Sequence, residues 1–167
     1  MQHSQYIKTG GKVLDVASGH GRNAIWLAQQ GFRVTAVDRD AAALSTLKNQ
    51  APSVDTHLQD LEQGYWPYSQ QQFDAIIVCR YLHRPLLPLL ANSLAPSGVL
   101  IYETFMEGHE QYGRPRNPDF LLKSNELLIS YLSLLQVISY NEGLLEQEPS
   151  PAVIQSLVAI KTSNRLS

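Results

Sequence analysis

Short apolar segments alternate along this chain with segments of helical character, and this alternation restricts the possible folds more than any other feature. Repeated strand–helix units are typical of a mostly parallel sheet with helices on both faces. The expected strands are at 12–17, 32–38, 54–58, 73–79 and 99–102, and the expected helices are at 22–30, 40–50, 85–94 and 124–133. Pro96, Ser97 and Gly98 are expected to form the turn before the fifth strand. The sequence therefore predicts an α/β fold.

Two further β-rich runs lie near the C-terminus, at 134–140 and 152–160, and we expect them to pair as an antiparallel hairpin. Before them, the chain from Glu103 to Lys123 carries two glycines and two prolines with little periodicity. A connection of about 20 residues is long for a loop, which indicates an irregular lid or binding loop. Ser124 is predicted to cap the helix that follows.

Length and charge limit the functions that the chain can have. Its 167 residues provide for one domain, 1–167, with one hydrophobic core, and 13 basic against 15 acidic residues do not favour a nucleic-acid partner. A single cysteine, Cys79, excludes an internal disulfide, and no paired Cys and His spacing indicates a metal site. No signal peptide or apolar stretch of about 18 residues is found, so we expect a cytoplasmic protein without a membrane partner.

The first strand opens into a glycine turn at a helix start, reading Asp15-Val-Ala-Ser-Gly-His-Gly21. Glycine permits positive φ and lets a ligand lie against the backbone, and the helix N-terminus offers free N–H donors. Asp38 closes the second strand, where a carboxylate can accept both hydroxyl groups of a ribose. Asp60 follows the third strand and can accept from an adenine amine. A small ligand is therefore expected at this turn.

Asp15 separates this pattern from that of a dinucleotide site. It lies within the strand, four residues before Gly19, where dinucleotide-binding strands carry an apolar residue, and a carboxylate there suits a cationic ligand. The loop also lacks the first glycine of Gly-x-Gly-x-x-Gly, because Ala17 and Ser18 precede Gly19. A nicotinamide-dependent oxidoreductase remains one alternative, and a cofactor-binding domain without catalysis remains another.

These residues resemble the first motif of the class I S-adenosylmethionine-dependent methyltransferases, Asp-x-Gly-x-Gly-x-Gly, with Ala17 in place of the first glycine. Asp38 and Asp60 match the ribose-binding and adenine-binding acids of that family. The stretches Gly21-Arg-Asn-Ala-Ile-Trp-Leu-Ala28 and Gly31-Phe-Arg-Val-Thr-Ala-Val-Asp38 are similar to its small tellurite-resistance and thiopurine methyltransferase-like branch. The resemblance implies a Rossmann-like, seven-stranded, mostly parallel sheet of order 3-2-1-4-5-7-6, with the last strand antiparallel and helices on both faces.

The resemblance also implies roles for parts of the chain: a cofactor half at about 10–80, a substrate-side loop at about 103–123 and a terminal hairpin at about 134–160. S-adenosylmethionine is the implied cofactor, and the implied reaction is methyl transfer to a small-molecule acceptor. The implied cofactor-binding residues are Asp15, Ala17, Ser18, Gly19, Gly21, Asn23, Asp38, Arg39, Asp60, Leu61 and Cys79. The first strand begins near Lys12, which leaves almost no room for the N-terminal helix that often covers the cofactor in this family. We therefore expect that the 103–123 loop or a partner subunit closes the site, or that the site stays partly open. A homodimer is compatible with the sequence.

Residues beyond the fourth and fifth strands are the candidates for chemistry, since ligands in open α/β sheets bind beyond the carboxyl ends of strands. Glu103 or His83 can take a proton from a neutral acceptor, whereas a thiolate or an oxyanion needs no base. The arginines can surround an anionic substrate, or they can pair with nearby acids. The candidate substrate residues are Arg80, Tyr81, His83, Arg114 and Arg116.

Overall fold

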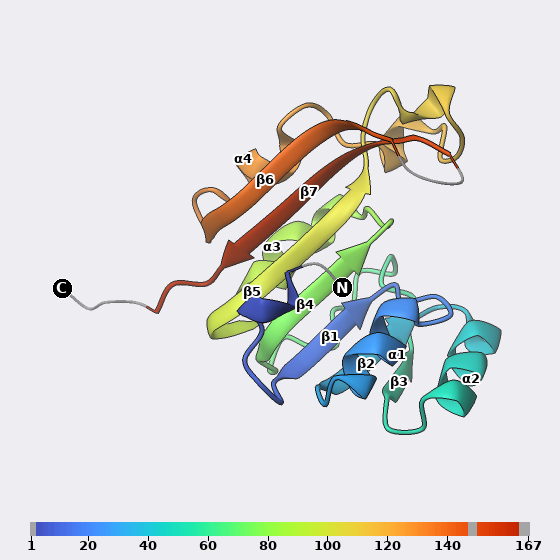
Figure 1. Cartoon of the computed structure of the whole chain (residues 1–167), viewed down its shortest axis with the longest axis vertical. Coiled ribbons are helices and arrows are strands. Elements are labelled where there is room, and N and C mark those ends of the chain that lie inside the picture. The colour runs from blue at the N-terminus through green and yellow to red at the C-terminus, as the bar shows by residue number, and fades with distance from the viewer. Residues whose placement is uncertain (1–2, 147–149, 164–167) are drawn as a thin grey trace.

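The computed structural model describes residues 3–146 and 150–163 as one twisted sheet with helices against both faces (Figure 1). The strands are β1 (Lys12–Val16), β2 (Arg33–Asp38), β3 (Asp55–Leu58), β4 (Phe73–Cys79), β5 (Leu94–Phe105), β6 (Gln136–Leu145) and β7 (Ala152–Ile160). The α-helices are α1 (Arg22–Gln29), α2 (Ala41–Gln50), α3 (Leu87–Asn92) and α4 (Glu126–Tyr131). Four short 3₁₀ turns are η1 (Ser4–Tyr6), η2 (Arg84–Leu86), η3 (His109–Gln111) and η4 (Pro118–Phe120).

The seven strands lie in the order β3-β2-β1-β4-β5-β7-β6. Strands β1 to β5 run parallel, and β7 runs antiparallel to both of its neighbours, β5 and β6. The predicted strand order, the antiparallel last strand and the terminal hairpin are thus confirmed. Because parallel strands end at the same edge of a sheet, the turns after β1, β2, β3, β4 and β5 all open at one edge.

The helices form two layers, and the period-two alternation of the strands supplies both cores. Val13 packs with Leu27 of α1, whereas the next residue, Leu14, belongs to the cluster that holds Leu90 of α3 and Leu127 of α4. In Figure 1, α1 and α2 lie in front of the half of the sheet that contains β1, β2 and β3. Among the described residues no α-helix lies in front of β5, β7 and β6, but η1 lies in front of β5, and Ile7 after it belongs to the same core as Val99 and Val158.

The helix predicted at 85–94 is shorter than expected and starts later. Residues 84–86 form η2, α3 covers only Leu87–Asn92, and Leu94 already belongs to β5. Pro85 and Pro88 both lie at the start of a turn because neither has an amide hydrogen to donate further along a helix. The chain therefore forms only a three-residue 3₁₀ turn and a six-residue α-helix before β5 begins.

The turn predicted at Pro96–Gly98 and the short strand 99–102 are also wrong in extent. Strand β5 begins before the turn residues and continues to Phe105, because the ladder with β4 shifts register between Phe73 and Ala75 and absorbs them. Gly98 is needed there, since an added Cβ would lie 2.8 Å from the carbonyl oxygen of Phe73. Glu103 consequently lies inside a strand rather than in a loop.

The 103–123 segment is less irregular than predicted. After β5 it contains η3 and η4, and Met106 forms a β-bridge with the fully buried Leu122. The prediction that Ser124 caps the next helix is wrong: α4 begins after Asn125, and the Ser124 hydroxyl instead donates to Oε1 of Glu142 on β6 at 2.7 Å.

Two features are absent from the described residues. No helix is long and apolar enough to cross a membrane. No three or more His, Cys, Asp or Glu side chains in the described part of the chain are grouped closely enough to hold a metal ion.

Candidate functional site

The turn between β1 and α1 adopts left-handed backbone conformations at three residues, Ala17 (φ 53°), Gly19 (φ 54°) and Gly21 (φ 76°). Ala17 has a Cβ and bears the steric cost of this conformation, which glycine would avoid. Gly21 is fixed by packing as well, because a Cβ there would collide with the side chain of Leu47 on α2. The local geometry therefore explains why the motif is rich in glycine.

The carboxylate of Asp38 is held in one orientation by two backbone amides. Its Oδ2 accepts from the amide of Gly19 at 2.7 Å, and its Oδ1 accepts from the amide of Asp40 at 2.9 Å. The first bond joins the end of β2 to the turn after β1. Both oxygens retain lone pairs, so the carboxylate can also accept from a ligand.

Asp15 is a buried acid with an unsatisfied oxygen. Only 2% of its surface is exposed, and Oδ2 has no hydrogen-bond partner among the described residues. Burial raises the pKa of Asp15 to about 7, against a hydrogen bond from the backbone of Ala24 that lowers it, and the nearby charge of Asp38 raises it further. A cation near this group would favour the ionised carboxylate.

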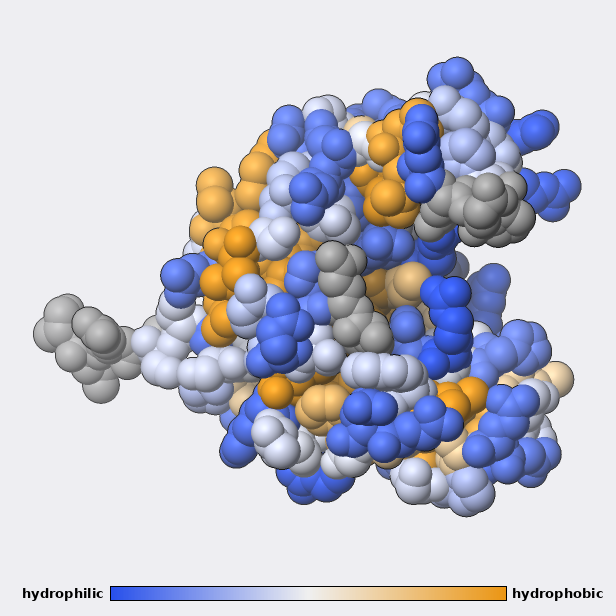
Figure 2. Space-filling view, viewed as in Figure 1, coloured by the Kyte–Doolittle hydropathy of each residue, from blue (hydrophilic) through white to orange (hydrophobic). Residues whose placement is uncertain are grey.

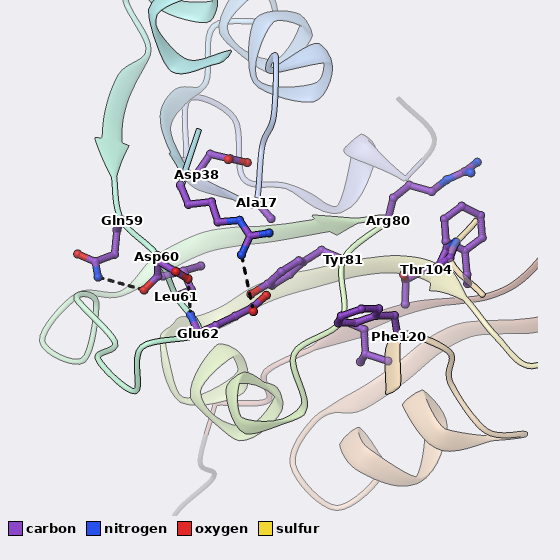
Figure 3. A pocket seen from close by; sticks show the side chains of 14 residues that line it. Ala17, Asp38, Gln59, Asp60, Leu61, Glu62, Arg80, Tyr81, Thr104 and Phe120 are labelled. Carbon is purple, nitrogen blue, oxygen red and sulfur yellow. Dashed lines mark hydrogen bonds and ion pairs between the residues drawn. The ribbon is translucent and has the colours of Figure 1, made fainter. Parts of the chain in front are cut away.

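A cavity of about 340 Å³, here the Asp38 cavity, lies at the edge where the parallel strands end (Figure 3). It brings together seven residues that the sequence had marked, and Figure 3 shows Asp38 and Asp60 on neighbouring strand ends beside it. The marked residues that line it are Ala17, Asp38, Arg39, Asp60, Leu61, Arg80 and Tyr81. The sequence did not single out the others, which are Gln59, Glu62, Leu82, Thr104, Phe105, Pro115 and Phe120.

Charged groups border the β3 side of this cavity. Nη1 of Arg39 lies 3.8 Å from Oε2 of Glu62, and Figure 3 shows this pair beside the ring of Tyr81. The carboxylate of Asp60 accepts from the backbone amide of Glu62 at 3.0 Å and from the side chain of Gln63 at 3.2 Å. These two bonds lower the pKa of Asp60, so it is an ionised acceptor at neutral pH.

Arg80 lies at the other side of the Asp38 cavity, in a left-handed conformation with φ 60°. Its guanidinium lies over the ring of Phe105, 4.6 Å from the centroid, and its Nε is 4.0 Å from Oε1 of Glu103. The Phe105 ring in turn stacks on His109, with 3.9 Å between ring centroids. Strand β5 thus supplies both the ring and the acid that position Arg80.

Arg80 and Phe105 also line a second hollow of about 450 Å³, here the arginine hollow. Arg22 and Arg114 line it as well, so three guanidinium groups border one space. His109 contributes no charge to it: Nδ1 accepts from the amide of Val153, so Nε2 carries the hydrogen and donates to the carbonyl of Arg114. The arginine hollow is therefore a basic site beside the Asp38 cavity.

A third hollow of about 190 Å³, here the strand-face hollow, lies between the start of α1 and strands β4, β5 and β7. Arg22 and Asn23 of α1 line it, together with Cys79 at the end of β4 and Glu103 within β5. Cys79 and Asn23, which the sequence had assigned to the cofactor, thus line this hollow rather than the Asp38 cavity. Burial raises the pKa of the Cys79 thiol, which keeps it protonated at neutral pH.

The remaining marked residues line none of these three spaces. They are Asp15, Ser18, Gly19, Gly21, His83 and Arg116. Asp15 lies within β1, Ser18, Gly19 and Gly21 shape the turn after it, and His83 precedes η2. Arg84, by contrast, is paired: its Nε lies 2.6 Å from Oε1 of Glu126, and its other nitrogens donate to the carbonyls of Asp119 and Leu121.

Comparison with known proteins gives the family. A sequence model described as a methyltransferase domain matches residues 13–98, just over half of the chain. An uncharacterised methyltransferase from Synechocystis is 34% identical over 93 residues, which are 56% of this chain and 42% of that protein. This chain thus spans less than half the length of that relative.

Solved structures show the same fold. TehB from Haemophilus influenzae superposes with a TM-score of 0.77 at 22% identity, over 92% of this chain and 58% of that one. A S-adenosylmethionine-dependent methyltransferase from Methanosarcina mazei superposes with a TM-score of 0.75 at 14% identity, over 95% of both chains. The matched residues 13–98 contain the glycine turn, Asp38 and Asp60. With the seven-stranded sheet around them, they make this chain a member of the class I S-adenosylmethionine-dependent methyltransferase family.

Proposed function

We propose that this chain transfers a methyl group from S-adenosylmethionine to a small-molecule acceptor that carries a negative charge. One observation carries the proposal: Asp38, locked by the amide of Gly19, and the ionised Asp60 line one cavity at the strand ends. A pair of carboxylates so placed matches the hydroxyl groups of a ribose and the amine of an adenine.

The chain's own residues fit this cofactor. Leu61 and Leu82 give the Asp38 cavity apolar walls suited to a base, between the acids that suit the polar edges of a nucleoside. The unsatisfied oxygen of Asp15 lies buried behind the turn, and its ionised form is favoured by a positively charged ligand. S-adenosylmethionine is a cation at its sulfur and its amino group, and it supplies an activated methyl group when bound.

In the transfer, a lone pair of the acceptor forms a bond to the methyl carbon while the bond from that carbon to sulfur breaks and its electron pair stays on sulfur. The protein's part is to hold the two molecules in line and to exclude water, which can account for a large share of the rate. Thr104 and Phe120, which Figure 3 shows on the side of the Asp38 cavity away from Asp60, line the part that would face the acceptor.

The negative charge of the acceptor is proposed from the arginine hollow. Arg80 lines both this hollow and the Asp38 cavity, and Arg22 and Arg114 line the hollow beside it. Guanidinium groups bind carboxylates and other oxyanions with two parallel hydrogen bonds. We propose that Arg80 and Arg114 bind the acceptor.

Glu103 is the candidate base for an acceptor that must lose a proton. Its carboxylate lies 4.0 Å from Nε of Arg80 and lines the strand-face hollow, so it is close to a group that Arg80 would bind. His83 lines none of the three spaces, which favours Glu103 over His83 in this role. An acceptor that is already a thiolate or an oxyanion needs neither residue.

Calorimetric titration with S-adenosylmethionine and S-adenosylhomocysteine tests the proposal. We expect binding in the micromolar range, lost in Asp38→Ala and in Gly19→Val, which places a branched side chain at φ 54°. Asp55→Asn is the matched control, since Asp55 is an exposed acid on the neighbouring strand β3 that does not line the Asp38 cavity. It removes the same charge and should leave the affinity unchanged.

Reduced nicotinamide dinucleotide is the competing ligand in the same titration. Binding of this dinucleotide without binding of S-adenosylhomocysteine would replace the proposal with an oxidoreductase. Binding of S-adenosylmethionine without consumption of it, over a panel of small thiols, carboxylates and oxyanions, would instead favour a cofactor-binding domain without catalysis.

A further inference from the structure

His109 is a buried polar residue that lines the arginine hollow together with Arg80 and Arg114. Only 5% of its surface is exposed, and both of its ring nitrogens have hydrogen-bond partners. Nδ1 accepts from the amide of Val153 at 3.3 Å, and Nε2 donates to the carbonyl oxygen of Arg114 at 3.0 Å. The edge of the ring therefore ties η3 to β7 and to the backbone of Arg114.

The face of the same ring reaches the support of a second arginine. It stacks on the ring of Phe105, with 3.9 Å between the centroids and 21° between the planes. The guanidinium of Arg80 lies over the Phe105 ring, 4.6 Å from its centroid. A cation held by the face of an aromatic ring is only as well placed as the ring itself. By fixing Phe105, His109 also fixes the site on which Arg80 rests.

The arginine hollow draws its cations from two regions of the molecule. Figure 2 shows a notch between the region of α1 and α2 and the region after β5, and hydrophilic side chains border it. Arg22 lines the hollow from the start of α1, whereas Arg114 lines it from the segment between η3 and η4. A helix holds Arg22 in place. The bond from His109 gives the segment of Arg114 a fixed point beside the hollow.

We infer that His109 is a positioning residue of the arginine hollow: its ring supports Phe105 under Arg80, and its Nε2 holds the backbone that carries Arg114. One side chain thereby sets the spacing of two guanidinium groups, on which the binding of a single oxyanion by both of them depends. The inference rests on the proposed function for the role of these two arginines in binding the acceptor.

Two variants separate the two contacts of His109. His109→Gln keeps a side-chain nitrogen that can donate to the carbonyl of Arg114, but it has no ring to stack on Phe105. His109→Phe keeps a ring and has no group that forms a hydrogen bond. A single cooperative thermal transition shows that each variant is folded.

His57→Gln is the matched control. His57 also stacks on an aromatic ring and also has a hydrogen-bond partner at each ring nitrogen, but it lies on β3 and lines none of the three spaces. The same substitution there removes the same kinds of contact without touching the arginine hollow.

The position of Arg80 can be measured without any ligand. The ring current of Phe105 shifts the proton resonance of the Arg80 Nε–H group upfield, and Arg80→Gln assigns this resonance by its loss. We expect His109→Gln to move it towards the resonance of an exposed arginine such as Arg116. His109→Phe and His57→Gln should leave it in place. An unmoved resonance in His109→Gln would overturn the inference.

Inorganic phosphate is the probe for the second contact, titrated by calorimetry. We expect Arg114→Gln and His109→Phe each to weaken phosphate binding about tenfold, and His57→Gln to alter it less than about twofold. The double variant of His109→Phe and Arg114→Gln should bind no more weakly than Arg114→Gln alone, because His109 acts through Arg114. Losses that add in the double variant would overturn the inference, since a general loss of stability would act in either background.

The two measurements distinguish this inference from the proposed function. Additive losses or an unmoved Arg80 resonance, in a protein whose phosphate binding depends on Arg80 and Arg114, would overturn the positioning role and leave the proposed function standing. A parent protein that binds no phosphate, but whose Arg80 resonance moves in His109→Gln, would support the positioning role. The same result would overturn the assignment of the arginine hollow to a negatively charged acceptor.

Discussion

The backbone amide of Gly19 donates a 2.7 Å hydrogen bond to Oδ2 of Asp38, which ties the turn after β1 to the end of β2 before any ligand is bound. Asp38 therefore has a structural task besides the proposed one. Asp38→Ala leaves the amides of Gly19 and Asp40 without their acceptor, and we expect a loss of about 1–3 kcal/mol in the free energy of unfolding. Urea denaturation measures this, and Asp38→Asn, which keeps one oxygen acceptor, should lose less. Equal stability of the Ala variant and the parent would show that the amides find water instead.

Ala17 is expected to be a site where glycine stabilises the protein. Its φ of 53° costs about 1–2 kcal/mol for a residue with a Cβ, and glycine would remove this cost. The greater conformational freedom of glycine in the unfolded chain opposes part of the stabilisation. Ala17→Gly should therefore raise the free energy of unfolding by about 0.5–1 kcal/mol. Ala24→Gly, in the buried face of α1, is the opposite control and should lower it. A destabilised Ala17→Gly protein would mean that the methyl group of Ala17 packs against something it needs.

Asp15 makes the stability depend on pH. The pKa of this carboxyl is raised from 3.8 to about 7, so the folded protein holds a proton that the unfolded chain has released over that interval. Stability due to this group is therefore highest at acid pH and falls as the pH rises from about 4 to about 7. Asp15→Asn removes the ionisation, and at pH 8 it should be more stable than the parent by on the order of 4 kcal/mol.

Thermal unfolding at pH 4.5 and pH 8, without ligand, measures this difference between the parent and Asp15→Asn. The gain should shrink strongly at the lower pH, where the parent carboxyl is protonated as well. A gain of the same size at both pH values would point to packing rather than to the charge of Asp15.

Arg84 fastens the segment after β5 to α4. It forms two bonds to Glu126 and donates to the carbonyls of Asp119 and Leu121, and although burial alone would raise the pKa of Glu126, these bonds lower it. Arg84→Met should therefore speed amide exchange and proteolytic cleavage within residues 106–123, with about 1–3 kcal/mol lost in overall stability. Arg84→Lys should not restore protection, because one ammonium cannot reach all four acceptors. Unaltered exchange would show that the Met106–Leu122 bridge holds the segment by itself.

The strand order was predictable from the resemblance of the first motif to a known family, and the positions of the two acids were predictable from the ends of the apolar runs before them. The carboxyl end of each parallel strand follows from its apolar run, so Asp38 and Asp60 could be placed at the sheet edge from their positions alone. The role of Arg84 could not be predicted in this way, since its partner Glu126 lies 42 residues further on. Only the packing of α4 against the sheet brings the two together.

The length of β5 was missed for a related reason. Pro96, Ser97 and Gly98 form a strong local turn signal, and Ser97 does take a φ of 63°. The ladder with β4 shifts register and continues around it, which depends on a strand elsewhere in the chain. The same extension places Phe105 under Arg80, so the site residues missed on β5 follow from the same error.

Gly21 and Asp60 both belong to the candidate site, but only Gly21 packs against another element, at Leu47 of α2. A Cβ at position 21 would have to displace the side chain of Leu47, so the packing of this turn against α2 favours glycine whether or not a ligand is bound. The carboxylate of Asp60 accepts two hydrogen bonds from residues of its own turn, so its structural role is local. Substitution of Gly21 is therefore expected to disturb the packing of the turn against α2, whereas substitution of Asp60 is expected to disturb only the turn after β3 and the ligand that it would bind.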